Sequence, residues 1–323
     1  MKKPGPGIIK RTGGFVPVLV AVALCSWLIQ HVTWPALSES LSRGRFDWFL
    51  PLAIVYAFVS FQIETVGLAV LFTRTVIRTP LQEVRVVKSV TQFMGMLNVW
   101  LGQAGMGYYY SRRSGLPMTY LSGVFALLLY TDLSVMFLFC GMIYKPGGEP
   151  YQFLYASVIA AGLILLPLFL VARKVSEWRL GDLAKRSVWF TKNGSRQLFA
   201  PLFLIPIADY LVIFAARFIR YPIRAAFVLL SLRAFHVDLP VMNGLVVSSF
   251  ILLAGSLPLT PMGVGVLQAA GLFLLHGLAP EADVLAGLLM VSVTVVTGNF
   301  VFGLYNLRGG IALIQNPTIG EDK

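Results

Sequence analysis

An apolar stretch from Leu252 to Leu275 is long enough to cross a bilayer, but its centre is interrupted. The interruption contains Pro258, Thr260, Pro261, Gly263 and Gly265. Prolines remove backbone donors and glycines loosen a helix, so amides and carbonyls are left without helical partners. At membrane depth such groups are tolerated only where they are buried in protein or line a cavity. The interruption therefore predicts a broken segment at a binding site.

The composition places the rest of the chain in a membrane as well. Of its 323 residues, 57% are hydrophobic and 12% are charged, and the mean hydropathy is +0.77. Apolar runs of about twenty residues, the length that crosses about 30 Å of hydrocarbon, recur throughout. The sequence predicts an all-α integral membrane protein with one polytopic domain, residues 1–323. Its net charge of +12 comes from basic residues between apolar runs, so anionic lipid is expected as a partner and nucleic acid is not.

The apolar runs predict about eight membrane crossings. They cover about 14–29, 48–72, 118–144, 151–172, 198–218, 223–235, 241–257 and 284–307. The run 223–235 is short for a crossing, so seven is the alternative. Basic residues after the second run, among them Arg74, Arg85 and Lys88, predict a cytoplasmic loop. Both termini are then cytoplasmic, in a bacterial-type inner membrane, with the first run retained as a span.

A second glycine-rich segment, residues 98–113, has a pattern like that of the interruption. Its spacing of one leucine and two glycines, at Leu101, Gly105 and Gly107, is the same as that at Leu259, Gly263 and Gly265. A second match lies downstream, where Leu121 and Gly123 have the same spacing as Leu285 and Gly287. We expect repeat-like halves, about 36–172 and 198–310, joined by a basic cytoplasmic loop, 173–197. One segment enters from inside and the other from outside, which is typical of an inverted repeat with two re-entrant segments. A chance match of glycines is the alternative.

Several charged residues fall inside or beside the predicted spans. Glu64, Asp132 and Asp209 would each cost about 2.5–3.5 kcal/mol if unpaired, so they should face the bundle interior. They are coupling carboxylates or members of structural ion pairs. Arg217, Arg220 and Arg224 share one helix face if Pro222 only kinks the chain, and they could hold a phosphate. They face the outside by the predicted topology, or are ordinary cytoplasmic arginines if that hairpin is reversed.

The sequence predicts neither a metal site nor a cofactor. His31, His236 and His276 lie in separate segments without metal-ligand spacing, and Cys25 and Cys140 lie in different spans. An enzyme is therefore less strongly indicated than a binding or transport protein.

The two glycine-containing motifs resemble those of a flippase-like integral membrane family related to the transmembrane region of lysylphosphatidylglycerol synthase. The resemblance covers about residues 36–310 and is most specific from Thr260 to Gln268. It implies an all-helical inner-membrane protein with a lipid-related role. The aminoacyl-transferring domain of the synthases is not in this sequence, so synthase chemistry is not implied.

This sequence also departs from the family pattern. Met262 replaces a glycine, and Gln268 replaces an acid, which puts proton coupling at that position in doubt because an amide does not titrate. In the first motif Gly102 replaces a proline, and Arg112 stands near the place of the family's arginine.

We therefore expect a transporter or flippase-like protein that binds or moves a phospholipid or a lipid-linked anion. The alternatives are an intramembrane lipid-modifying enzyme or its subunit, and a non-catalytic scaffold of a membrane complex; a membrane protein partner or a homo-oligomer fits each. The predicted substrate-binding residues are Asn98, Gln103, Gly105, Arg112, Arg113, Arg217, Arg220, Arg224, Thr260, Pro261, Gly263, Gly265 and Gln268. Glu64, Asp132 and Asp209 are the predicted coupling or ion-pair carboxylates, and no catalytic residue is predicted.

Overall fold

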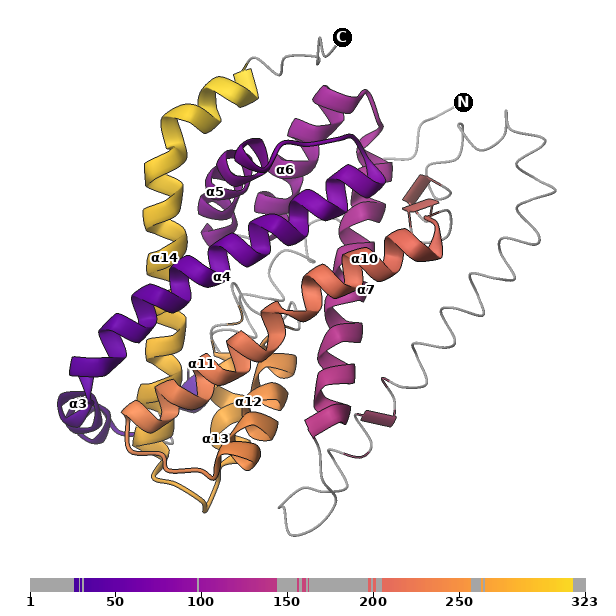
Figure 1. Cartoon of the computed structure of the whole chain (residues 1–323). Coiled ribbons are helices and arrows are strands. Elements are labelled where there is room, and N and C mark those ends of the chain that lie inside the picture. Colours follow the sequence, from indigo (N-terminus) through magenta and orange to yellow (C-terminus); the bar gives the residue numbers. More distant parts are fainter. Residues whose placement is uncertain are drawn as a thin grey trace, which may run out of the picture. The chain divides into compact units, whose positions relative to one another are not determined.

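The computed structural model describes residues 26–28, 30, 32–97, 99–143, 156, 159–160, 162, 197–198, 200–201, 205–256, 263 and 265–315. Within these residues the regular secondary structure is helical, which confirms the all-α class (Figure 1). The helices are α3 (Trp34–Arg43), α4 (Phe46–Thr75), α5 (Leu81–Leu97), α6 (Val99–Ser114), α7 (Met118–Ile143), α10 (Ile207–Phe218), α11 (Arg220–Ala234), α12 (Val241–Gly255), α13 (Val266–Leu274) and α14 (Glu281–Gln315).

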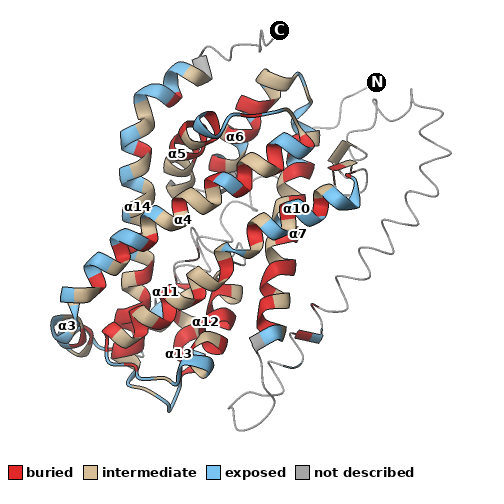
Figure 2. Ribbon diagram, viewed as in Figure 1, coloured by how far each residue is buried: buried red, intermediate tan, exposed pale blue. Residues whose placement is uncertain are grey.

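Three helices are long and apolar enough to cross a membrane. They lie in α4, α7 and α14, and α12 is a shorter apolar helix. These helices contain the predicted spans 48–72 and 284–307 and all but the last residue of the span 118–144. Apolar side chains such as Val301, Leu304 and Tyr305 of α14 are exposed, as expected of a surface that faces lipid (Figure 2). The predicted runs 14–29 and 151–172 fall mostly outside the described residues.

The chain divides into two compact units. Unit 1 contains Met1–Pro51 and Phe227–Val293, and unit 2 contains Leu52–Ala226 and Thr294–Lys323. The boundaries fall inside α4, α11 and α14, so each of these helices contributes to both units. The predicted halves 36–172 and 198–310 stay a prediction.

Unit 2 is organised around a hairpin of the two short helices α5 and α6. The glycines of the first motif do not interrupt α6; they bring it close to α5 instead. A Cβ atom on Gly102 would lie 2.6 Å from the Thr91 carbonyl oxygen. Phe72 and Tyr110 stack at 3.9 Å in the adjoining core.

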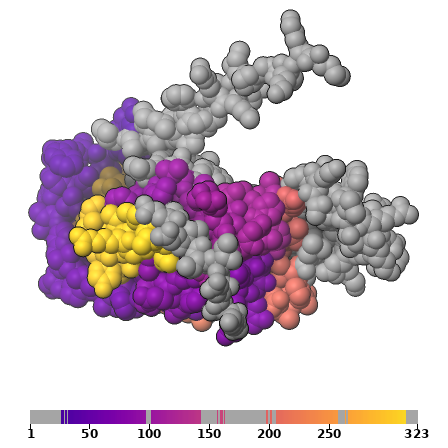
Figure 3. Space-filling view, turned by 90° about the horizontal axis from the view of Figure 1, so that it is seen from above, coloured from indigo at the N-terminus to yellow at the C-terminus, as the bar shows by residue number. Residues whose placement is uncertain are grey.

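The C-terminal part of α14 packs against the opposite side of α5. A Cβ atom on Gly303 would lie 2.8 Å from the Phe93 side chain, and Asn306 Nδ2 donates to Ser89 Oγ at 3.0 Å. In the space-filling view the yellow end of α14 borders the violet surface of this region (Figure 3). The glycines of α14 therefore allow two helices of unit 2 to approach closely.

Unit 1 contains a second hairpin, formed by α12 and α13. Gly263 and Gly265, just before α13, have positive φ angles of 72° and 91°, which glycine adopts without strain. A Cβ atom on Gly263 would collide with the Gly255 carbonyl oxygen at the end of α12. The glycines of the second motif are thus required by the backbone of the turn and by its close approach to α12.

The two hairpins are followed by the same kind of element. In each case a hairpin comes before a long helix, α7 after α5–α6 and α14 after α12–α13. A proline stands directly before each of the helices α5, α7, α12 and α14, and its carbonyl oxygen accepts the first backbone hydrogen bond of that helix. The prolines are Pro80, Pro117, Pro240 and Pro280, with bonds of 3.2, 3.3, 2.8 and 3.1 Å. The repeat and its inverted orientation both stay predictions.

The runs 198–218 and 223–235 were expected to be separate spans, but α10 and α11 are nearly continuous (Figure 1). Ile219 between them keeps helical angles, φ −59° and ψ −31°. Pro222 lies in the first turn of α11, where a proline costs no helical hydrogen bond. The number of membrane crossings stays a prediction.

Candidate functional site

A network of buried charges occupies unit 2. Arg217, the last basic residue of α10, is almost fully buried and holds Asp132 of α7 with two hydrogen bonds. Its Nε and Nη2 atoms donate to the two carboxylate oxygens at 2.7 and 2.6 Å. Two parallel bonds of this kind form the strongest geometry between arginine and a carboxylate. The pair therefore fixes α10 against α7.

Glu64 of α4 is the second centre of the network. One carboxylate oxygen lies 3.2 Å from Nη2 of Arg220, and the other lies 3.2 Å from Nζ of Lys88. Gln92 Nε2 also donates to Glu64, at 3.2 Å. Arg220 Nη1 lies 3.8 Å from Asp132, so Arg220 connects the two carboxylates. One charge network thus joins α4, α5, α7, α10 and α11.

Lys88 is held in α5 with none of its side chain exposed. Its Nζ donates to the Phe61 carbonyl oxygen at 2.9 Å and to Thr65 Oγ1 at 3.4 Å. The ammonium also lies 4.1 Å from the centre of the Phe61 ring. These contacts replace the hydrogen bonds to water that the ammonium loses on burial. They explain how Lys88 can be buried between α4 and α5.

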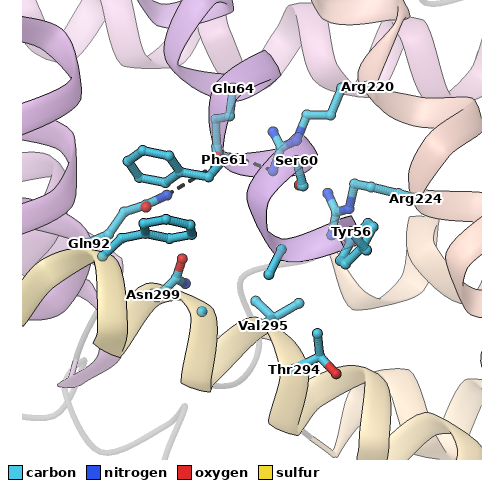
Figure 4. A pocket seen from close by; sticks show the side chains of 13 residues that line it. Tyr56, Ser60, Phe61, Glu64, Gln92, Arg220, Arg224, Thr294, Val295 and Asn299 are labelled. Atoms are coloured by element: carbon cyan, nitrogen blue, oxygen red, sulfur yellow. Dashed lines mark hydrogen bonds and ion pairs between the residues drawn. The ribbon is translucent and has the colours of Figure 1, made fainter. Parts of the chain in front are cut away.

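A cavity of about 110 Å³ adjoins this network. Arg220 and Arg224 extend into it from α11, while Tyr56, Ser60 and Glu64 line it from α4 (Figure 4). Gln92 of α5 and residues of α14, among them Thr294, Val295 and Asn299, complete the wall. The lining combines two guanidinium groups with neutral hydrogen-bonding side chains and one carboxylate.

Arg224 differs from the other buried cations of this region. It forms no ion pair or hydrogen bond with any residue that the structure describes, although it is only partly exposed and stands one helical turn from Arg220. Within the same described part of the chain, Nη1 of Arg217 and Nε of Arg220 are buried without an acceptor. Of these three arginines, Arg220 and Arg224 line the cavity, and a guanidinium group without an acceptor there favours an anionic ligand.

A family model for the lysylphosphatidylglycerol synthase transmembrane region matches residues 14–303. The chain belongs to this family. None of the curated proteins compared with the chain matches it. Membership makes it a multi-pass membrane protein linked to lipid metabolism or transport.

In this member of the lysylphosphatidylglycerol synthase transmembrane-region family, the arginines at the end of the first motif are divided between two environments. Arg113 is mostly buried, with 11% of its side chain exposed, and pairs with Glu83 of α5 at 2.7 Å; Glu83 also accepts a bond of 3.0 Å from Tyr109. Arg112 is exposed, with its guanidinium 5.8 Å from the Tyr108 ring centre. Arg113 therefore fastens α6 to α5.

The remaining residues predicted around the first motif do not line the cavity. Gln103 and Gly105 lie half-buried in α6, and Gly105 faces Thr91 and Met94 of α5. Asp209 forms a separate pair of 2.8 Å with Arg74. Asn98 falls outside the described residues. Of the three predicted carboxylates, the structure brings Glu64 and Asp132 into one network and leaves Asp209 apart.

The second motif of this family member lies in unit 1, where Gln268 has a structural position. It is fully buried, and its Oε1 accepts a bond of 2.7 Å from the Gly265 N–H. Its Nε2 donates to Ser292 Oγ at 3.0 Å and to the Leu288 carbonyl oxygen at 3.4 Å, both in α14. Gln268 thus caps α13 and ties it to α14. Thr260 and Pro261 lie outside the described residues, and ligand binding by this motif stays a prediction.

Sequence reasoning missed several polar residues of the site, among them Ser60, Lys88, Gln92 and Asn299. Lys88 was expected in a cytoplasmic basic loop because it follows other basic residues. Its spacing from Gln92, four residues, places both on one face of an α-helix and could have indicated an inward polar stripe. Ser60 and Glu64 have the same spacing on α4.

Proposed function

We propose that this protein binds the headgroup of a lipid or lipid-linked anion in the cavity of unit 2 and moves the lipid between leaflets. The observation that carries the proposal is Arg224, a partly buried cation without an acceptor among the described residues, beside Arg220 in that cavity. A phosphate oxygen is a suitable acceptor because guanidinium groups bind phosphate with paired hydrogen bonds.

The other groups of the cavity fit the same ligand. Ser60 and Asn299 offer neutral donors on opposite walls. Glu64 holds Arg220 when the cavity is without a ligand and competes with an entering phosphate for it. Exchange of Arg220 between Glu64 and the headgroup keeps the guanidinium paired throughout, which lowers the cost of binding and release.

The membrane-length helices around the cavity supply the path for the acyl chains. Within unit 2, α4 exposes Val55, Phe58 and Val66, and α14 exposes Val301 and Leu304. A headgroup can leave water for the cavity while its apolar tails stay in hydrocarbon, so only the polar part needs a protein environment. We place the protein in a bacterial-type inner membrane with both termini in the cytoplasm.

Reconstitution tests this proposal. Full-length protein in vesicles containing a fluorescent anionic phospholipid should accelerate exchange of that lipid between leaflets, measured by reduction of the dye in the outer leaflet. Arg224→Gln should abolish most of the acceleration. Arg78→Gln is the matched control because Arg78 is exposed and lies outside the cavity. Equal rates with and without wild-type protein, over a panel of anionic headgroups, would refute the proposal.

A deletion strain distinguishes this function from the two alternatives. An intact lipid that accumulates in the wrong leaflet supports transport. A missing covalent lipid product indicates an intramembrane enzyme or its subunit. Loss of another membrane complex, with both lipid composition and leaflet distribution unchanged, indicates a scaffold.

A further inference from the structure

The charges around the cavity of unit 2 do not balance. By formal charge, Lys88, Arg217, Arg220 and Arg224 contribute four positive charges, and Glu64 and Asp132 contribute two negative charges. Glu64 is shared by Lys88 and Arg220, and Asp132 is shared by Arg217 and Arg220. Among the described residues, this cluster therefore has two positive charges in excess.

The burial of the cluster makes this excess significant. Lys88 and Arg217 have 0% and 2% of their side chains exposed, and Arg220 has 18%. Charges removed from water interact strongly and are costly unless they are paired. The excess would be tolerated on a solvated surface, but in a helix bundle within a membrane it calls for negative charge from elsewhere.

We propose that the cavity takes a terminal phosphate with two negative charges, that is, the phosphomonoester or diphosphate end of a lipid. This inference rests on the proposed function and specifies its substrate class. A dianion neutralises the cluster, whereas the phosphodiester of an ordinary phospholipid supplies one charge and leaves one cation in excess. A zwitterionic or cationic headgroup would add positive charge beside Arg224.

The arrangement of the donors agrees with a terminal phosphate. Arg220 and Arg224 stand at positions i and i+4 of α11, so their guanidinium groups can approach one phosphate from the same helix face. Ser60 and Asn299 can donate to its remaining oxygens. A terminal phosphate has three non-bridging oxygens that can accept hydrogen bonds. A phosphodiester has two, and the cavity would also have to accommodate its second substituent.

Two probes with the same acyl chains separate these possibilities. They are dioleoyl phosphatidate, a monoester, and dioleoyl phosphatidylmethanol, a diester of nearly the same size. Binding to purified full-length protein in neutral-lipid nanodiscs is measured by titration at pH 8. We expect phosphatidate to bind about tenfold tighter or more, the effect of one additional well-placed ion pair.

The pH dependence gives an independent readout. The second pKa of a phosphate monoester is near 6, so phosphatidate loses its second charge as the pH falls from 8 to 5. Its advantage over phosphatidylmethanol should shrink over this range. The titratable groups that line the cavity are Tyr56, Glu64, Arg220 and Arg224, and α14 contributes neutral residues. Lys88, Asp132 and Arg217 belong to the charge network beside the cavity. Their titration would change the binding of both probes, so the ratio of the affinities isolates the ligand.

Substitutions at Arg224 complete the test. Arg224→Gln removes one of the two excess charges and should reduce the preference for phosphatidate at pH 8 about tenfold. Arg224→Lys keeps the charge and should retain most of the preference, and Arg78→Gln should leave it unchanged. Arg224 pairs with no described carboxylate, so its loss leaves no buried acid unpaired.

The outcomes separate this inference from the proposed function. Equal affinity for both probes at pH 8, or a preference that Arg224→Gln does not alter, overturns the dianion assignment and leaves anion binding intact. Failure of both probes to bind overturns the proposed function as well. A preference that disappears at pH 5 and in Arg224→Gln supports the assignment.

Discussion

The hairpin of α5 and α6 in unit 2 and the hairpin of α12 and α13 in unit 1 each bring two short helices together at glycines. In the first, Gly102 lies against the backbone of α5, and in the second, Gly263 lies against the end of α12. Both hairpins follow a proline whose carbonyl accepts the first helical hydrogen bond. Each motif therefore supplies one glycine for close helix packing, although Gly102 lies outside the spacing that the two motifs share.

The two hairpins differ in the polar groups that they bury. The first contains Glu83, Lys88 and Arg113, all in ion pairs, whereas the second contains neutral residues such as Ser248, Ser249 and Gln268. The first borders the charged cavity of unit 2 through Gln92. The difference teaches that the glycines of the two motifs pack helices, whereas the proposed binding chemistry comes from residues that the motifs do not include.

The largest effect should come from breaking the ion pair inside the first hairpin. Arg113→Met leaves Glu83, with 8% of its side chain exposed, without its cation at 2.7 Å. We expect a loss of about 3–5 kcal/mol in the free energy of unfolding, the usual cost of one uncompensated buried charge. Unfolding by SDS titration in mixed micelles measures it. A loss below about 1 kcal/mol would show that the hairpin does not need this pair.

The next effect concerns the close approach of helices in the first hairpin. Gly102→Ala places a methyl group 2.6 Å from the Thr91 carbonyl oxygen, so α5 and α6 must separate, and we expect about 1–3 kcal/mol of destabilisation. Gly105→Ala is the matched control, because its nearest neighbours are side-chain atoms at 3.4 and 3.5 Å. The same unfolding measurement should find the control within about 0.5 kcal/mol of wild type. Equal losses in both variants would contradict the predicted packing.

A smaller effect is expected from the neutral polar group of the second hairpin. Gln268→Leu leaves the Gly265 N–H without its acceptor and removes the bonds to Leu288 and Ser292. We expect a loss of about 1–2 kcal/mol, since hydrogen bonds in membrane proteins contribute modestly. Lipid exchange, corrected for the amount of folded protein, should stay at the wild-type rate. A stable variant with no exchange would instead place Gln268 in the transport path.

The smallest effect should be at Arg112, the exposed neighbour of Arg113. Its described contact is with the Tyr108 ring at 5.8 Å, so Arg112→Met should cost no more than about 0.5–1 kcal/mol. The comparison with Arg113→Met keeps the residue type and the chain position nearly constant. If Arg112→Met stops lipid exchange in a stable protein, the first motif binds substrate directly, as the sequence suggested.

Much of the fold could be predicted from the sequence. The apolar runs 48–72 and 118–144 agree closely with membrane-length helices because length and apolarity alone decide whether a segment suits a bilayer. The family membership could be predicted from the glycine motifs. The spacing of Arg217, Arg220 and Arg224 also indicated a shared helix face, which depended only on Pro222 falling in a first helical turn.

The site could be predicted only in part. Glu64, Asp132 and the three arginines were recognised because charges inside apolar runs are conspicuous. Lys88 was not, because adjacent basic residues gave it the composition of a loop, although the structure buries it against Phe61 and Glu64. The position of Gln268 suggested a binding residue, whereas its hydrogen bonds cap a helix and join it to α14.

The sequence by itself determined that this chain is an all-α membrane protein with two glycine-rich motifs, since hydropathy, proline and glycine act locally along the chain. The structure placed those motifs in helix hairpins, whereas the sequence had predicted re-entrant segments. Only the tertiary structure decided which charges meet. The network combines residues from four helices: Glu64, Lys88, Asp132 and Arg220. Spacing along the sequence does not decide which of the several cations pairs with each carboxylate. The residual positive charge beside Arg224 follows from how those partners are shared, because an ion pair depends on distance in space.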